Sequence, residues 1–172
     1  MATAKTDTAA GGEALTITRV FDAPRELVFD AWTNPDRLKD WFGPAGFTML
    51  SCSGEFRPGG VFHYGMRAPN GMEMWGKWTI REIVRPERLV IVASFSDAAQ
   101  GETRHPFAAN WPLKVLSTST FSETGGKTTM TMSSVPLDAT EGEQAAFVAG
   151  FDSMRQGWKG TLEQLDAYLA KA

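Results

Sequence analysis

The chain has 172 residues, 42% of them apolar and 11% aromatic, and a formal net charge of −3. This length suits one domain with a single sizeable core. Lysines and arginines are mixed with acidic residues and form no basic stripe, which argues against nucleic acid as a partner. No stretch approaches the roughly 18 consecutive apolar residues that span a membrane. Cys52 is the one cysteine, so an intrachain disulfide is excluded.

The first residues, MATAKTDTAAGGE, are small and polar and lack the apolar segment of a signal peptide. We therefore expect residues 1–13 to form a disordered lead and residues 14–172 to form a single domain. Because the sequence shows no secretory signal, no membrane span and no disulfide pattern, we expect a cytoplasmic protein.

Residues 14–46 predict a strand followed by two short helices. Leu15 and Ile17 alternate with polar residues, as in a half-buried strand. Asp22 is expected to cap the first helix, with Pro24 at a first position where the missing N–H costs nothing. The buried sides of the two helices are expected to consist of Leu27, Val28, Ala31, Trp32, Leu38, Trp41 and Phe42. Of these, the two tryptophans and Phe42 are interpreted as packing residues.

Six further strands are predicted before the C-terminal region, each bounded by turn residues. They span residues 47–53, 61–68, 72–84, 89–96, 112–122 and 127–134. Pro69-Asn70-Gly71 favours a tight hairpin turn, and residues 97–110 are expected to form a long irregular loop. A bulge near Gly76 would shift the strand register by one residue, so the face on which nearby side chains lie stays open.

Residues 141–170 switch to a helical period. Apolar residues recur every third or fourth position at Phe147, Phe151, Met154, Trp158, Leu162, Leu165 and Leu169. Gly150, Gly157 and Gly160 interrupt this stripe, and such glycines indicate a bend or a close approach of backbone. Since a sheet with one apolar face must cover it, this helix is expected to lie across the sheet in an α+β domain.

Several short motifs follow one another in a particular order along the chain. They are Ala23-Pro24, Val28-Phe29, Ala31-Trp32-Thr33, Pro35, Leu38, Trp41-Phe42-Gly43-Pro44, Phe56-Arg57-Pro58-Gly59-Gly60, Pro86-Glu87-Arg88-Leu89-Val90 and Gly157-Trp158. This ordered set resembles the activator-of-Hsp90-ATPase-like family of the SRPBCC (START-like, Bet v 1-like) superfamily. The resemblance implies a helix-grip fold, in which a curved antiparallel sheet of about six to seven strands wraps on a long C-terminal helix with a cavity between them.

The polar residues show no arrangement typical of catalysis or metal binding. His63 and His105 lie far apart, no Cys or His pair has metal-ligand spacing, and nothing orders a nucleophile beside a base. We therefore expect no metal, no cofactor and no catalytic residue. His63 alternates out of phase with its apolar neighbours and is expected to be solvated. His105 is expected to be an exposed loop residue or to line a pocket mouth, and Cys52 to be a small buried hydrophobe.

Aromatic residues and methionines are numerous, with six tryptophans, eleven phenylalanines and eight methionines. Two explanations remain open: a solid core, or a ligand cavity, which tolerates flat rings and flexible thioethers that repack around a guest. The candidates for lining such a cavity are Phe62, Tyr64, Met66, Trp78, Phe95, Trp111, Met130, Met132, Phe151, Met154 and Trp158.

Three functions follow as hypotheses. The first is binding of a small hydrophobic or aromatic molecule, lipid-like or a metabolite, which the resemblance also implies. The second is an enzyme of the cyclase or hydrolase type acting in the cavity, since a cyclase can work by shaping its pocket. The third is a chaperone-associated role, which is not favoured because the chain has only the one domain. A weak homodimer is left open.

Overall fold

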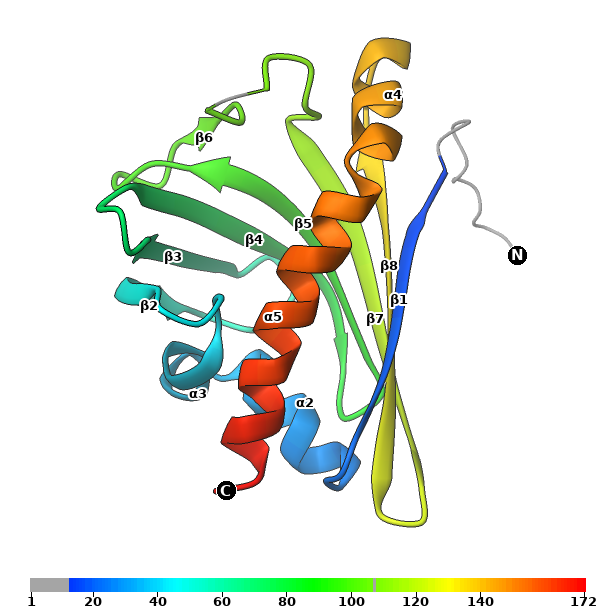
Figure 1. Cartoon of the computed structure of the whole chain (residues 1–172). Coiled ribbons are helices and arrows are strands. Elements are labelled where there is room, and N and C mark those ends of the chain that lie inside the picture. The colour runs from blue at the N-terminus through cyan, green and yellow to red at the C-terminus, as the bar shows by residue number, and fades with distance from the viewer. Residues whose placement is uncertain (1–12, 107) are drawn as a thin grey trace.

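The computed structural model describes residues 13–106 and 108–172. A curved antiparallel sheet wraps around a long C-terminal helix (Figure 1). In chain order the elements are β1 (Leu15–Phe21), α2 (Arg25–Thr33), α3 (Pro35–Trp41), β2 (Thr48–Gly54), β3 (Val61–Arg67), β4 (Glu73–Val84), β5 (Arg88–Ser96), β6 (Glu102–Thr103), β7 (Lys114–Thr124), β8 (Lys127–Leu137), α4 (Glu141–Ala149) and α5 (Phe151–Leu169). This confirms the predicted α+β helix-grip fold. The predicted lead, residues 1–13, lies outside the described residues except for Glu13.

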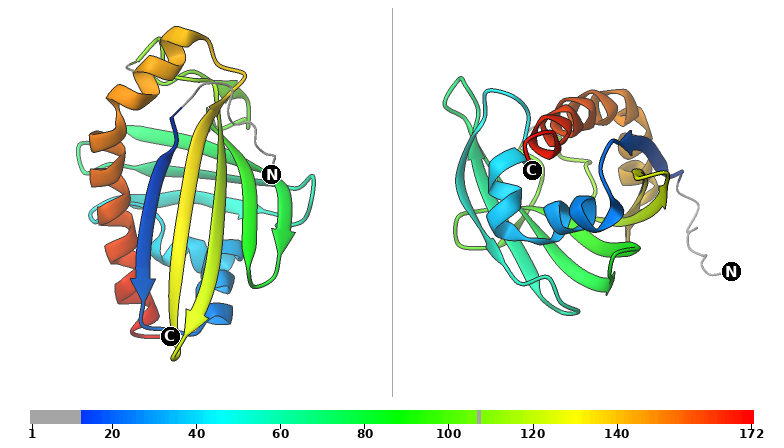
Figure 2. Two further views of the ribbon diagram at one scale, coloured as in Figure 1. Left: turned by 90° about the vertical axis from the view of Figure 1, so that its right-hand side faces the viewer. Right: turned by 90° about the horizontal axis from the view of Figure 1, so that it is seen from below.

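The sheet follows the order β1-β8-β7-β5-β4-β3-β2, with the short β6 paired to β5. Every pairing is antiparallel. Helix α5 runs along the concave side of this curved sheet (Figure 2). The sheet contains one strand more than the sequence predicts, because β6 lies inside the loop that was expected to be irregular. One face of the sheet is therefore covered by helix, as an apolar face requires.

The β3–β4–β5 register is regular at Gly76, where a bulge was considered. Gly76 pairs directly with Tyr64 and Phe95, and the irregularity falls instead between Ile80 and Glu82. A Cβ at position 76 would lie 2.4 Å from the hydroxyl oxygen of Tyr64. The glycine is therefore needed because the Tyr64 ring lies close to its backbone. The sequence prediction of a bulge at this glycine was wrong, because the glycine marks a close approach instead.

Helix α2 begins differently from the prediction. Its N-cap is Pro24, not Asp22, and no side chain of the cap residue accepts a hydrogen bond. Instead the carboxylate of Glu123, in the β7–β8 hairpin, accepts a bond from the Arg25 N–H at 2.7 Å. A carboxylate also suits the positive end of the helix dipole. The capping group is thus supplied by a residue distant in sequence, which local spacing cannot indicate.

The C-terminal helical stripe is broken at Gly150, which separates α4 from α5. Thr140 and Glu143 form a capping box at the start of α4, each side chain bonded to the other residue's backbone N–H. A Cβ on Gly150 would lie 2.8 Å from the Trp111 ring, so this glycine marks a close approach. Gly160 differs, because no atom lies within 4 Å of its Cβ position.

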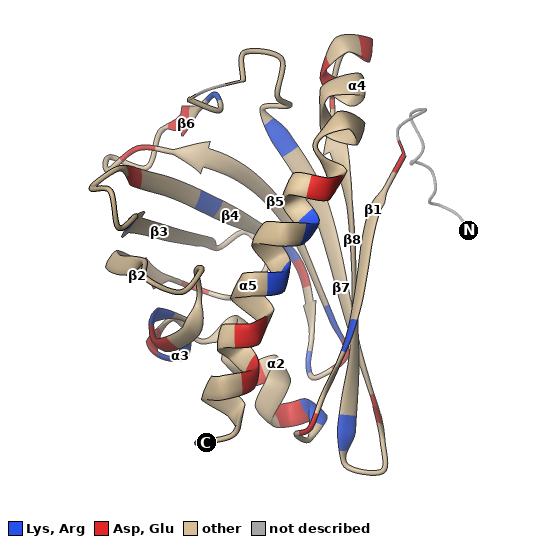
Figure 3. Ribbon diagram, viewed as in Figure 1, with Lys and Arg blue, Asp and Glu red and all other residues tan. Residues whose placement is uncertain are grey.

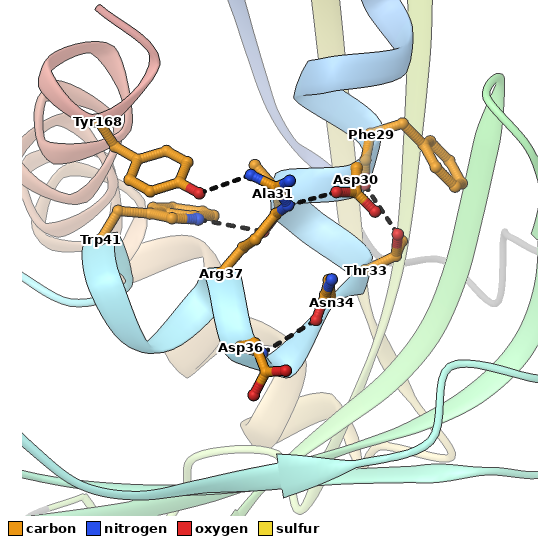
Figure 4. A network of polar contacts seen from close by, with 9 residues as sticks. All are labelled: Phe29, Asp30, Ala31, Thr33, Asn34, Asp36, Arg37, Trp41 and Tyr168. Atoms are coloured by element: carbon orange, nitrogen blue, oxygen red, sulfur yellow. Dashed lines mark hydrogen bonds and ion pairs between the residues drawn. The ribbon is translucent and has the colours of Figure 1, made fainter. Parts of the chain in front are cut away.

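Side-chain contacts with α2 and α3 fix the last turns of α5. The guanidinium of Arg37 on α3 pairs with Asp30 on α2 and donates to the Tyr168 hydroxyl at 2.9 Å (Figure 4). These bonds, that to Tyr168 foremost, raise the pKa of Arg37 above its usual value. The Trp41 indole donates to the carbonyl of Ala31 at 3.1 Å. Helices α2, α3 and α5 are thereby tied together at one end of the sheet.

Burial along α5 changes at its midpoint. Leu162, Leu165 and Leu169 are buried, whereas Phe151, Met154 and Trp158 are only half-buried. The register predicted for the helix is therefore correct, but burial against the sheet is complete only in its C-terminal half. The N-terminal half lies against a space that side chains do not fill.

We expect Leu165→Ala to lower the free energy of unfolding by about 2–5 kcal/mol, the range for buried leucines. Met154→Ala should cost less, about 1 kcal/mol, because the half-buried thioether has fewer neighbours to lose. Urea titrations of the two variants compare them directly. Equal losses would show that α5 packs uniformly along its length, against the observed burial.

Candidate functional site: a cavity between sheet and helix

A cavity of about 620 Å³ lies between the sheet and the helices α4 and α5. Strands β4, β5, β7 and β8 supply one wall, and the N-terminal half of α5 with α4 supplies the other. Trp32 of α2 lines it, as does the loop that contains His105 and Trp111. Its lining residues are Leu15, Trp32, Trp78, Leu89, Ile91, Ala93, Phe95, His105, Ala108, Trp111, Val115, Ser117, Ser119, Met132, Ser134, Ala146, Phe147, Ala149, Gly150, Ser153, Met154 and Trp158.

A smaller cavity of about 240 Å³ lies beside the first, between α5 and the loop after α3. Phe95, Met154 and Trp158 line both cavities and so form the partition between them. Of these, Met154 and Trp158 lie on the half-buried part of α5.

The structure brings together most of the residues expected to line a cavity. Trp78, Phe95, Trp111, Met132, Met154 and Trp158 line the larger cavity, and Tyr64 and Met66 line the smaller one. Three candidates line neither, namely Phe62, Met130 and Phe151.

The three remaining candidates have other neighbours. Phe62 is fully buried against Phe56 and Trp78, with ring centroids 5.3 and 4.9 Å apart. Met130 is likewise fully buried in the core. Phe151 stands just after the helix break, where its ring packs edge-on against Phe147 at 5.6 Å. Strand alternation alone could not separate these positions, because core and cavity residues share the same face of the sheet.

Sequence reasoning missed a strip of serines on the cavity wall. Ser117 and Ser119 of β7 and Ser134 of β8 are buried and line the cavity. The signal was available, because a period of two from the buried Phe121 places Ser119 and Ser117 on the inner face. Attention to large apolar side chains overlooked them.

The hydroxyls of this strip are incompletely paired. The Ser134 hydroxyl donates to the Ser117 oxygen at 3.0 Å, across a directly paired position of the two strands. Within residues 13–106 and 108–172, the Ser117 proton finds no acceptor and the Ser119 hydroxyl makes no hydrogen bond. Both oxygens face the cavity rather than a sealed core, because Trp32 Nε1 is the one fully enclosed side-chain polar atom without a partner among the described residues. The wall therefore offers hydrogen-bonding capacity that the described part of the protein leaves unused.

Trp32 has a similar feature, although it was expected only to pack. Its ring lies against those of Trp41, Trp78 and Trp158, with centroids 4.9, 6.4 and 5.9 Å away. Its indole nitrogen is buried and has no hydrogen-bond partner among the described residues. This N–H and the free serine hydroxyls belong to side chains that line the same cavity.

None of the described residues lining the larger cavity is Lys, Arg, Asp or Glu. The ribbon coloured by charge shows charged residues on helices, on loops and on several strands, β4 and β7 among them (Figure 3). On α5, Asp152, Arg155, Lys159 and Glu163 are exposed. His105 lines the cavity with its ring 4.8 Å from that of Phe95, and loss of hydration lowers the pKa of this imidazole. The cavity therefore presents neutral groups at neutral pH.

His63 is buried rather than solvated, which corrects the prediction. It points away from the cavity as the alternation indicated, but the Trp75 ring stacks on it at 5.4 Å. Its Nε2 hydrogen-bonds the carbonyl oxygen of Asp97 at 2.8 Å. Gly65, which pairs with Trp75, leaves room for that indole, since a Cβ there would lie 2.4 Å from it. The aromatic cover, not the alternation, decides the exposure of His63.

Cys52 is half-buried, and burial raises the pKa of its thiol to about 11. The thiol donates to the carbonyl of Pro35 at 3.4 Å. A thiol with a raised pKa is a weak nucleophile at neutral pH. Among residues 13–106 and 108–172, no group of three His, Cys, Asp or Glu side chains could hold a metal ion.

One ion pair joins the loop at the cavity to helix α4. Arg104 pairs with Glu143 and also donates to the carbonyl of Trp111 at 3.2 Å. The Glu143 carboxylate accepts the Thr140 backbone N–H at 3.0 Å. That bond first, and the Arg104 bond second, lower the pKa of Glu143. One carboxylate thus caps α4 and fixes the loop that carries Trp111.

The fold and the cavity define the class: a helix-grip protein of the START-like type. The family model for activator of Hsp90 ATPase homolog 1-like proteins matches residues 22–170, so the chain belongs to this family. Within the described residues, every helix is too short or too polar to span a bilayer.

Solved structures of bacterial proteins share the fold. Protein Ms6760 from Mycobacterium smegmatis is 26% identical, with a TM-score of 0.72, covering 91% of this chain and 90% of that one. A protein from Arthrobacter aurescens is 27% identical, with a TM-score of 0.73 and coverage of 92% and 87%. The AHSA1 protein from Silicibacter pomeroyi is 18% identical, with a TM-score of 0.68 and coverage of 92% and 98%. No curated protein matches the chain significantly.

We expect Gly150→Ala to displace the Trp111 ring, because a Cβ there would lie 2.8 Å from it. The near-UV circular dichroism of the tryptophans should change, and thermal stability should fall. Gly160→Ala is the matched control: it meets no atom within 4 Å and should stabilise the helix by up to about 1 kcal/mol. A Gly150 variant that behaves like the control would contradict the close contact with Trp111.

The lowered pKa of Glu143 gives a pH prediction. The stabilisation from this carboxylate is present above the pKa of an unfolded glutamate and is lost as pH falls through the folded value. Hydrogen exchange of α4 amides should therefore show protection that declines on acidification, relative to α5. Glu143→Gln keeps an oxygen for the Thr140 N–H but does not titrate, so its α4 protection should depend less on pH. Identical pH dependence in both proteins would exclude this role for Glu143.

Proposed function

We propose that this protein binds a small hydrophobic or aromatic molecule in the cavity between the sheet and α5. The observation that carries the proposal is the size of the cavity, about 620 Å³. Pockets for small organic ligands span roughly 300–1,000 Å³ and are lined mainly by apolar and aromatic side chains. Membership of the family and the START-like fold are compatible with this function.

A packing defect is the competing explanation, and the volume argues against it. Natural protein interiors have few voids larger than a water molecule, and an apolar cavity of about 150 Å³ already binds benzene. The space here is several times larger and borders the half-buried side chains of Met154 and Trp158 on α5. The cavity is also partly open to solvent, so a guest can enter it and water can occupy it when no guest is bound.

The lining suits an apolar guest. Trp78, Trp111 and Trp158 offer flat ring faces, and Met132 and Met154 offer flexible thioethers. Burying roughly 200 Å² of apolar guest surface contributes about 5 kcal/mol at about 25 cal/mol per Å². Association and ordering oppose part of this. The cavity wall also loses apolar surface to the guest, which adds to the favourable free energy of binding. A well-fitting guest should therefore bind in the micromolar range.

The test is a titration with N-phenyl-1-naphthylamine, a neutral apolar probe that fluoresces when it leaves water. We expect saturable binding at about one site per chain, with unchanged near-UV circular dichroism, which distinguishes a native cavity from a molten state. The probe should also change the tryptophan emission, because four of the lining residues are tryptophans.

A filling variant shows where the probe binds. Met132→Trp projects a larger ring into the cavity and should weaken probe binding at least tenfold while the protein stays folded. Thr131→Trp is the control, because Thr131 lies on the same strand with its side chain on the opposite face. Absence of saturable binding, or equal effects of the two variants, would refute the proposed function.

A further inference from the structure

Resting on the proposed function, we infer that the ligand is electrically neutral and carries a carbonyl or another hydrogen-bond acceptor. The geometry sets that acceptor against Ser117 and Ser119 on the β7 wall. The class is thus neutral aromatic or alicyclic ketones, esters and amides, as opposed to carboxylates such as fatty acids or to pure hydrocarbons.

The first argument is the chemical contrast within the wall. In the register of the sheet, Ser117 lies between Ile91 and Ser134, and Ser119 lies between Leu89 and Met132. Hydroxyls therefore interrupt an otherwise apolar surface at its centre. The described residues leave part of the hydrogen-bonding capacity of these hydroxyls unused, and a ligand acceptor in the cavity can bond to them.

The second argument is the direction of the free hydrogen bonds. Ser134 donates to Ser117, so the Ser117 oxygen already accepts one bond and its proton is available to donate. The Ser119 hydroxyl makes no bond within the described parts of the chain. A ligand acceptor is the group that uses both protons. A hydrocarbon would leave them unpaired.

The third argument concerns charge. Of the described residues that line the cavity, none is a lysine or an arginine, and the lowered pKa of His105 keeps its imidazole neutral. A carboxylate moved into this space would lose its hydration and gain no cation in return. Neutral acceptors lose far less hydration, so the same hydroxyls favour them over anions.

The experiment uses three ligands with the same ring system, measured by displacement of N-phenyl-1-naphthylamine at neutral pH. They are 2-acetylnaphthalene, a neutral acceptor; 2-ethylnaphthalene, its hydrocarbon analogue; and 2-naphthoate, an anion. We expect 2-naphthoate to bind at least about tenfold more weakly than 2-acetylnaphthalene. Equal or tighter binding of 2-naphthoate would overturn the assignment of a neutral ligand.

Serine variants test the acceptor. Ser119→Ala or Ser117→Ala should weaken 2-acetylnaphthalene by roughly three- to tenfold, the value of one hydrogen bond, and change 2-ethylnaphthalene by less than about twofold. Ser122→Ala, an exposed serine on the same strand, is the control and should change neither. Ser119→Ala should also fold at least as stably as the wild type, since it removes an unpaired hydroxyl.

The outcomes separate this inference from the proposed function. If the fluorescent probe itself does not bind, the proposed function fails. If the probe binds but both serine variants leave 2-acetylnaphthalene unchanged, or weaken it and 2-ethylnaphthalene alike, the cavity binds ligands without the acceptor contact. Either of the latter results overturns the inference while the proposed function stands.

Discussion

The fixed position of α5 at its two ends is the constraint on which the cavity depends. At the C-terminal end, three buried leucines and the bond between Arg37 and Tyr168 hold the helix on α2 and α3. At the N-terminal end, the Trp111 ring lies against the helix break at Gly150. Between these points the cavity separates the N-terminal half of α5 from the sheet. These contacts at both ends hold α5 in place beside the cavity.

The two halves of α5 therefore have different roles, one in stability and one in lining the cavity. The C-terminal half of α5 contributes solid packing, whereas the N-terminal half supplies Met154 and Trp158 to a wall that a ligand can contact. The packing at the C-terminal end of α5 stabilises the fold, while the other end of the helix leaves a cavity that is partly open to solvent. Arg104 and Glu143 complete the arrangement, because their ion pair holds the Trp111 loop against α4.

Local patterns in the sequence predicted the elements well, because each depends on nearby residues. The stripe from Phe147 to Leu169 and the alternation in β3 place side chains on the correct faces. The failures involve contacts between distant parts of the chain. Glu123 caps α2 in place of Asp22, and Trp75 covers His63, whose exposure was predicted wrongly. Such partners become neighbours only when the sheet has formed.

The candidate site was predictable in part for the same reason. Composition and strand phase favoured an aromatic surface facing the helix, but phase cannot tell Phe62 in the core from Trp78 at the cavity. That distinction depends on how far α5 stands from each strand, which only the tertiary structure determines. The period of two along β7 was enough to place its serines on the inner face. Their role as hydrogen-bonding groups becomes clear only once the structure shows that the surrounding cavity wall is apolar.

The central claim, a preformed neutral site between sheet and helix, is tested most directly by a crystal structure with 6-bromo-2-acetylnaphthalene. The anomalous signal of bromine locates the ring without reference to binding assays. The account predicts bromine inside the larger cavity, the ketone oxygen within hydrogen-bond distance of Ser117 or Ser119, and α5 in an unchanged position. Bromine only on the outer surface, or an α5 that has closed onto the sheet, would contradict it.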